Sequence, residues 1–331
     1  MHKEPLDFIH NVGSEFLARA DVPNEKTLRA WRPSGLLWPM LRDIQGRALG
    51  LRKRTRIIDG KRVVWLQGGN PKGTPVVLLH GFGASKENWL TLLPLLTQRY
   101  SLYVPDLPGW GESHFCYDKT YSIDAQVERV AEWMSAVLPG HAHLVGSSMG
   151  GTIAALVAAR HPDLLCSLTL MNAAGVQGAV MSPFEKALLR GKNTLVAQST
   201  LDVAKVIQAV THRNKAVLTA TLTPLMSQMM VPRKKVNQHM FIQLMQSPPS
   251  QSQPSIKDIQ TPTLIMWGDR DRIIDVSCVE TFAQLIPHAE IKLLRDVGHL
   301  PMLEVPSLTS RCLRRFWRAY NITSKKTNIA A

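Results

Sequence analysis

A serine in a tight, glycine-framed turn is the first candidate for chemistry. Residues 146–150 read GSSMG, a G-x-S-x-G pattern. A strand-like run leads into this turn, and an apolar, helix-like run leads out of it. A strand–turn–helix of this kind projects the serine hydroxyl, and it needs glycine two residues to either side because larger side chains would clash. The pattern predicts Ser148 as a nucleophile, against the alternative of a glycine-rich packing turn.

Two backbone amides could stabilise the negative charge that such a nucleophile creates. The run HGFG at 80–83 follows an apolar strand-like segment. In acyl transfer, fixed N–H groups beside the nucleophile bind the developing oxyanion, and each contributes about 3 kcal/mol. We expect these donors at Phe82 and Met149. His80 is expected to be structural.

A carboxylate and a histidine near the C-terminus could complete a proton relay. The run GDRDRIID at 268–275 follows an apolar strand-like segment, and we favour Asp271 over Asp269 because Asp269 falls within the turn itself. Asn172 stands at the preceding strand end, where it cannot carry charge. His299 follows the last strand-like run. The order serine, aspartate, histidine then assigns attack to Ser148, proton transfer to His299 and tautomer control to Asp271.

The elements needed to position these residues alternate along the chain. Short apolar runs alternate with longer amphipathic ones, which is typical of a mostly parallel central sheet with flanking helices. The expected strands are 63–66, 76–80, 101–105, 142–146, 166–171, 263–267 and 290–294. Expected helices include 122–138 and 151–160, and a helical stretch is also expected after the HGFG run.

The alternation stops after residue 175, which suggests an insertion. From 176 to 258 the pattern is helical only, with stretches near 183–190, 200–211, 214–222 and 232–246. We therefore predict an α/β fold with three parts. These are an N-terminal helical extension (1–55), a catalytic domain (56–175 and 259–322) and an inserted helical cap (176–258).

Together these runs resemble a known family. The segments HGFGASKENW, DLPGWGES, LVGSSMGG, WGDRDRIIDV and GHLPMLEVP resemble the α/β-hydrolase superfamily over about residues 60 to 320. Further segments, YSIDAQVERV, MNAAGVQ and MVPRKKVNQHMF, are similar to the branch of monoacylglycerol lipases and bacterial membrane-associated lipases or phospholipases. The resemblance implies an α/β-hydrolase fold and hydrolysis of acyl esters. Serine at the elbow separates the chain from relatives that use aspartate there.

The composition indicates the cellular compartment and the kinds of partner to expect. The four cysteines are scattered, without metal-ligand spacing or a disulfide framework, so neither a metal nor another cofactor is expected and a reducing compartment is the default. No signal peptide and no apolar run long enough to span a membrane is found, which predicts a cytoplasmic protein.

The net charge is +14. Segments 29–62 and 176–258 together carry a net charge of +15, and the rest of the chain carries −1. This charge suits an anionic surface or simply solubility. Nucleic-acid binding is not expected because the basic segments lack interleaved aromatic residues.

An amphipathic segment near the N-terminus predicts contact with a membrane surface. Six apolar residues recur there at three- and four-residue steps, with Trp38 and several arginines around them. These residues are Leu37, Met40, Leu41, Ile44, Ala48 and Leu51. The alternative is that the stripe packs on the protein itself or on a second copy. The sequence does not fix the oligomeric state.

The leading functional hypothesis is a serine hydrolase that cleaves medium- or long-chain acyl esters, such as monoacylglycerols or lysophospholipids, through an acyl-enzyme. Six of the thirteen methionines fall in the predicted cap, where they would suit either a tolerant acyl pocket or ordinary packing. Two alternatives remain. One is a carbon–carbon hydrolase of the meta-cleavage type, and the other is a ligand-binding protein that keeps the fold without turnover.

Overall fold

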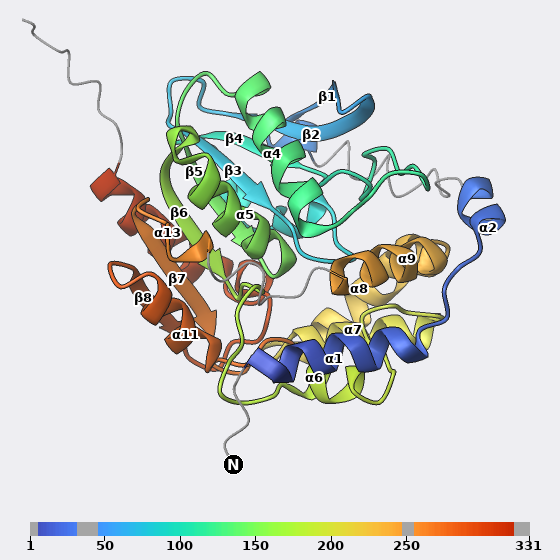
Figure 1. Ribbon diagram of the computed structural model, residues 1–331. Coiled ribbons are helices and arrows are strands. Elements are labelled where there is room, and N and C mark those ends of the chain that lie inside the picture. Colours follow the sequence, from blue (N-terminus) through green and yellow to red (C-terminus); the bar gives the residue numbers. More distant parts are fainter. Residues whose placement is uncertain (1–5, 32–45, 247–254, 321–331) are drawn as a thin grey trace, which may run out of the picture.

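The centre of the molecule is a twisted sheet with helices on both faces (Figure 1). The computed structural model describes residues 6–31, 46–246 and 255–320. Within these ranges eight strands form one sheet in the order β1-β2-β4-β3-β5-β6-β7-β8. The strands are β1 (Arg52–Ile58), β2 (Lys61–Gly69), β3 (Pro75–Leu79), β4 (Ser101–Pro105), β5 (Ala142–Ser147), β6 (Leu165–Met171), β7 (Thr263–Gly268) and β8 (Glu290–Leu294). β2 runs antiparallel to β1 and β4, and all pairs from β4 to β8 are parallel.

The central strands are apolar because both of their faces are covered. In β3, Val77 and Leu79 contact one buried cluster, whereas Val76 and Leu78 contact another on the opposite face. The first cluster includes side chains of α4 (Ile123–Val137), α5 (Met149–Arg160) and α11 (Cys278–Leu285). The second includes side chains of α13 (Pro306–Tyr320) and of the 3-10 turns η1 (Lys86–Trp89) and η2 (Leu93–Leu95). Continuous apolar runs are the expected pattern for strands buried on both sides.

All seven predicted strands are present, but the sequence missed β1. This strand begins at Arg52, so the last residues of the predicted helical extension (1–55) belong to the sheet instead. The strand has the sequence RKRTRII and lies at the sheet edge, where its first six residues are exposed. Since neither face is buried over those residues, no alternation of apolar and polar side chains marked it.

The helical stretch expected after the HGFG run is also wrong in detail. That segment forms the two short turns η1 and η2, and Pro94 lies within η2. Proline lacks a backbone N–H and clashes with the preceding turn, which disfavours a continuous α-helix. The remaining elements are η3 (Pro162–Leu164) and α12 (Pro301–Glu304).

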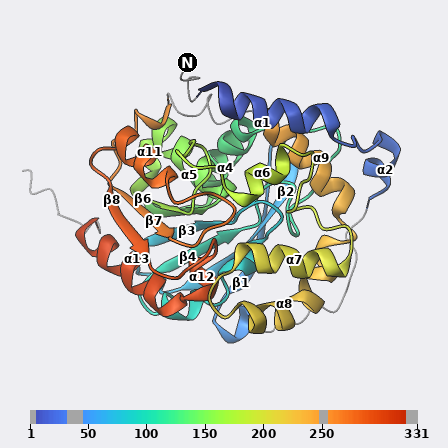
Figure 2. The same cartoon turned by 90° about the horizontal axis from the view of Figure 1, so that it is seen from below.

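The described residues between 176 and 258 contain helices and no strand. These helices include the short α6 (Pro183–Leu188) and the longer α7 (Thr200–Val210), α8 (Lys215–Met230) and α9 (Lys234–Met245). The N-terminal helix α1 (Leu6–Arg19) lies against α6 and α9, and the short α2 (Glu25–Ala30) follows it (Figure 2). The division into extension, catalytic domain and cap remains a prediction.

Most of the predicted amphipathic stripe, from Leu37 to Ile44, lies outside the described residues. Of its last two members, Ala48 is exposed and Leu51 is buried in the core beside Leu66. Leu51 therefore packs on the protein itself, as the alternative interpretation of the stripe proposed.

Candidate active site

Ser148 occupies a strained turn between β5 and α5. Its φ of 56° and ψ of −123° lie in a region that side-chain-bearing residues rarely adopt. Three backbone N–H groups hold the turn by donating to the Ser148 carbonyl, those of Gly151 at 2.8 Å, Ala174 at 3.0 Å and Thr152 at 3.3 Å. This geometry is the one predicted for a nucleophile elbow.

The surrounding glycines are required by space. A Cβ at Gly146 would lie 2.1 Å from the carbonyl oxygen of Gly150, and one at Gly150 would lie 2.5 Å from that of His80. A Cβ at Gly81 would lie 2.9 Å from the Ser148 Cβ. The turn at 146–150 and the HGFG loop are therefore in contact, with Ser148 at their junction.

Asp271 and His299 form a buried hydrogen-bonded pair at the same edge of the sheet. His299 Nδ1 lies 2.7 Å from Asp271 Oδ2, and both side chains are almost fully buried. Asp271 follows β7, and His299 follows β8. The carboxyl ends of these two strands lie at the same edge of the sheet as the carboxyl ends of the parallel strands β5 and β6. The other carboxylate oxygen, Oδ1, accepts the N–H groups of Ile273 at 2.8 Å and Ile274 at 3.1 Å.

Asp269 has a different partner. Its Oδ1 accepts the N–H of Asp296 at 2.7 Å, and its side chain is partly exposed. Asp269 thus closes the loop after β8, whereas Asp271 is the residue that contacts the histidine.

Asn172 has a positioning role that the sequence did not reveal. Its side-chain amide donates to Asp271 Oδ2 at 2.7 Å and to the Gly298 carbonyl at 3.4 Å. The residue is fully buried with a positive φ of 45° at the end of β6. Sequence reasoning treated it only as an uncharged residue where an acid could have been, although a buried amide at a strand end needs a polar partner.

Glu304 is a second residue with an unforeseen role. Its buried carboxylate accepts the N–H of Gly298 at 3.0 Å, of His212 at 2.8 Å and of Arg213 at 2.7 Å. The His299 N–H itself donates to the Val210 carbonyl at 3.0 Å. The histidine loop is therefore attached to the segment that joins α7 and α8.

His80 is structural, as expected. Its Nε2 accepts the Leu107 N–H at 3.0 Å, so Nδ1 carries the proton and donates to the Gly81 carbonyl at 2.8 Å. The ring is completely buried, and this burial lowers the pKa of His80 to about 4. A neutral imidazole thus connects the HGFG loop to residue 107.

We expect this histidine to make the fold sensitive to acid. Because the folded-state pKa of about 4 lies below the ordinary histidine pKa of 6.5, the unfolded chain binds the proton first, and stability falls as pH drops from 6.5 toward 4. The full effect of this one group is roughly 3 kcal/mol in the free energy of unfolding. Urea denaturation of the wild type and of His80→Gln at several pH values should show the wild type losing its advantage as pH falls. Parallel curves for the two proteins would contradict this role.

A buried ion cluster fixes the HGFG loop against the DLPGWGES loop. Lys86 Nζ lies 2.6 Å from Asp106 Oδ2 and 2.8 Å from Glu112 Oε2, and Lys86 and Asp106 are fully buried. Asp106 also accepts the Lys86 N–H at 2.8 Å. Removing Lys86 would leave the buried Asp106 carboxylate without its cation, so this lysine ties the two loops together.

Arg233, the residue directly before α9, joins this helix to the two loops. Its guanidinium lies over the rings of Trp31 and Trp110 at 4.8 and 5.4 Å and donates to the Gly109 carbonyl. Burial lowers the pKa of Arg233 to about 10, so it remains charged at neutral pH. The Trp110 ring in turn contacts Phe82 at 5.0 Å.

The two amides predicted to bind an oxyanion lie on the segments that meet at Ser148. Phe82 follows Gly81, and Met149 is the first residue of α5. Within the described residues, neither N–H donates to a backbone carbonyl. Amides at such positions are free to bind an anion, and the helix dipole of α5 favours negative charge at Met149.

Comparison with known proteins agrees with this fold. A family described as alpha/beta hydrolase fold matches residues 74–306. Lipase 1 of Psychrobacter immobilis is 31% identical over 266 residues, which cover 80% of this chain and 83% of the relative. Monoacylglycerol lipase ABHD6 of Mus musculus is 27% identical, over 90% of this chain and 94% of its own. The crystal structure of a membrane phospholipase A superposes with a TM-score of 0.81 at 36% identity, over 86% of this chain and 91% of that one.

The chain belongs to the α/β-hydrolase fold family. The comparisons confirm the predicted fold and the predicted class of enzyme, a carboxylic ester hydrolase. In the described ranges no helix is both long and apolar enough to cross a membrane.

Proposed function

We propose that the protein hydrolyses lipid acyl esters with Ser148 as nucleophile, His299 as general base and Asp271 as the acid that orients it. The observation that carries this proposal is the 2.7 Å contact between His299 and a carboxylate with further hydrogen bonds, at the edge of the sheet where the Ser148 elbow stands. Such bonds hold the imidazole in the tautomer that leaves Nε2 free to take a proton.

The reaction then follows from these roles. The Ser148 Oγ attacks the ester carbonyl while His299 takes its proton, and the N–H groups of Phe82 and Met149 bind the oxyanion. His299 next donates the proton to the leaving alcohol. Water, activated by the same base, then hydrolyses the acyl-enzyme and regenerates Ser148.

The substrates we propose are monoacylglycerols, lysophospholipids or similar esters with medium or long acyl chains. The names of the lipase and phospholipase relatives support this class. The methionines of the predicted cap give it less support, because Met230 and Met240 are buried in packed clusters. These two at least serve ordinary packing.

A substrate panel with an active-site probe tests the proposal. We expect turnover of p-nitrophenyl esters and monoacylglycerols, and labelling of the protein by a fluorophosphonate. Faster turnover of an aromatic ring-cleavage product would instead indicate carbon–carbon hydrolysis. Absence of both turnover and labelling would indicate a ligand-binding protein.

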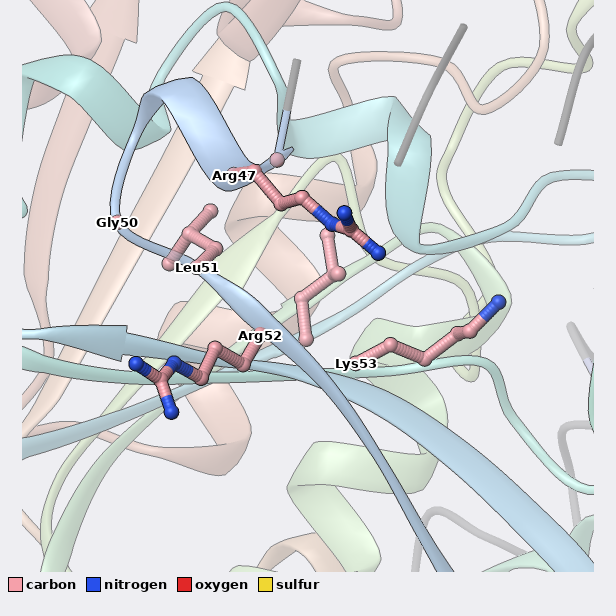
Figure 3. A pocket seen from close by; sticks show the side chains of 7 residues that line it. Arg47, Gly50, Leu51, Arg52 and Lys53 are labelled. Carbon is pink, nitrogen blue, oxygen red and sulfur yellow. The ribbon is translucent and has the colours of Figure 1, made fainter. Parts of the chain in front are cut away.

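The proposal includes contact with an anionic membrane surface through the basic edge strand. Arg52, Arg54 and Arg56 are exposed on β1, and Arg47 lies on the turn before it. A hollow of about 640 Å³ lies between this turn and the strand, and the side chains of Arg47, Arg52 and Lys53 extend around it (Figure 3). Each cation near an anionic leaflet contributes about 1 kcal/mol.

Vesicle sedimentation measures this contact. We expect binding to vesicles that contain anionic lipid, weaker binding at higher salt, and a loss of roughly tenfold or more when Arg52, Arg54 and Arg56 become Gln. Replacing Lys26, Lys72 and Lys257 by Gln removes the same charge elsewhere and should have little effect. Equal binding to neutral and anionic vesicles, or none to either, would exclude electrostatic docking.

A further inference from the structure

A groove separate from the basic edge strand lies among α1, α6, α7 and α9. In Figure 1, α1, α6 and α7 lie at the bottom of the molecule and β1 lies at the top. Figure 2 shows these helices from below. The groove has a volume of about 730 Å³ and is also lined by the segment at 191–198 and by Arg272 and Ile273. The last two residues directly follow Asp271, so the groove borders the loop of the proposed catalytic acid.

The charged lining of the groove is unbalanced. Six cations line it, of which Arg19, Lys205 and Lys235 pair with Glu15, Asp202 and Asp21 respectively. The other three, Lys192, Lys234 and Arg272, form no ion pair with any residue in the described part of the chain. Three uncompensated cations around one hollow attract an anion, and a guanidinium beside ammonium groups suits the several oxygens of a phosphate.

The apolar lining of the groove leads toward Ser148. Phe16 and Phe184 line the groove, and their rings lie 5.2 and 6.3 Å from that of Phe241. The Phe241 ring in turn lies 5.1 Å from that of Phe82, which carries one of the two proposed oxyanion donors. Two packed aromatic side chains, Phe241 and Phe82, therefore connect the aromatic lining of the groove to the HGFG loop beside Ser148.

We propose that this groove binds the phosphate head group of a single-chain lipid, so that the enzyme prefers anionic lysophospholipids over neutral monoacylglycerols. The unpaired cations and the apolar side chains of this lining match an amphiphile with one charged end. The preference rests on the proposed ester hydrolysis, whereas binding of the lipid does not.

Binding is tested first, with Ser148→Ala so that no turnover intervenes. Calorimetry below the micelle concentration should give a dissociation constant for decanoyl lysophosphatidylglycerol that is at least about tenfold lower than that for monodecanoylglycerol. Adding Lys192→Gln and Lys234→Gln should remove this difference. Adding Lys72→Gln and Lys257→Gln, which removes two lysines outside the groove that have no ion pair within the described ranges, should preserve it. Inorganic phosphate alone should bind much more weakly, because it lacks the apolar chain.

Kinetics with intact Ser148 test the preference. The Lys192→Gln/Lys234→Gln variant should raise KM for the anionic lipid about tenfold and leave kcat and the neutral ester unchanged. Equal affinity for both lipids, or loss of binding in the control variant as well, would overturn the groove assignment while ester turnover stands. Selective binding without turnover of any ester would contradict the proposed function and the preference, but leave the binding site intact.

Discussion

Replacing Ser148 by alanine is expected to abolish both ester hydrolysis and fluorophosphonate labelling. Loss of the nucleophile typically lowers kcat by about 10⁵-fold or more, and the residual rate comes from binding and the oxyanion donors alone. The elbow should survive the change, because the hydrogen bonds that hold it use the Ser148 backbone. Mass spectrometry of the labelled protein and initial rates with a p-nitrophenyl ester measure the effect.

The neighbouring serine provides a matched control. Ser147 is fully buried, and its hydroxyl has no hydrogen-bond partner in the described part of the protein. Ser147→Ala should therefore retain labelling and most of the activity. Labelling that persists in Ser148→Ala would exclude Ser148 as the nucleophile.

Asp271→Asn is expected to lower kcat by about 10⁴-fold with little change in KM. Four donors surround this carboxylate, from His299, Asn172, Ile273 and Ile274. Because the two backbone N–H groups retain the single amide oxygen, the new NH₂ group faces His299 Nδ1. The histidine must then accept there and carry its proton on Nε2, which is the wrong tautomer for a base.

Asp269→Asn is the matched control for Asp271→Asn. An asparagine there can still accept the Asp296 N–H through its amide oxygen. We expect a loss of activity of less than about tenfold, since no proposed catalytic contact is removed. If Asp269→Asn proved the more damaging substitution, the proton relay would run through Asp269 and the assignment of Asp271 would be wrong.

The fold was predictable where local sequence and burial agree. Buried strands such as β3 and β5 are continuous apolar runs, and the glycines at 146 and 150 mark a turn that excludes side chains. β1 was not predictable in this way because its exposed edge position leaves no apolar pattern. Arginines that look like a helix face or a tail in the sequence lie on a strand instead.

The candidate site was predictable only at the level of chemical types. The residue types of Ser148, Asp271 and His299 and their order along the chain indicate a catalytic triad. Asn172 and Glu304 instead act through hydrogen-bond partners that are distant in sequence. The Asn172 amide reaches a carboxylate 99 positions away, and Glu304 accepts an N–H from a residue 92 positions away. Such contacts depend on the order of strands in the sheet, which no local pattern specifies.

The shared carboxylate of Glu304 limits how the active site can open. It holds the start of the histidine loop and the turn after α7 at the same time, and the His299 N–H is bonded to the end of α7. The turn at 210–213 is thus tied by hydrogen bonds to the loop of the proposed base. A movement that admits a lipid has to hinge elsewhere among these helices, because a shift at this turn would displace the base in the same motion.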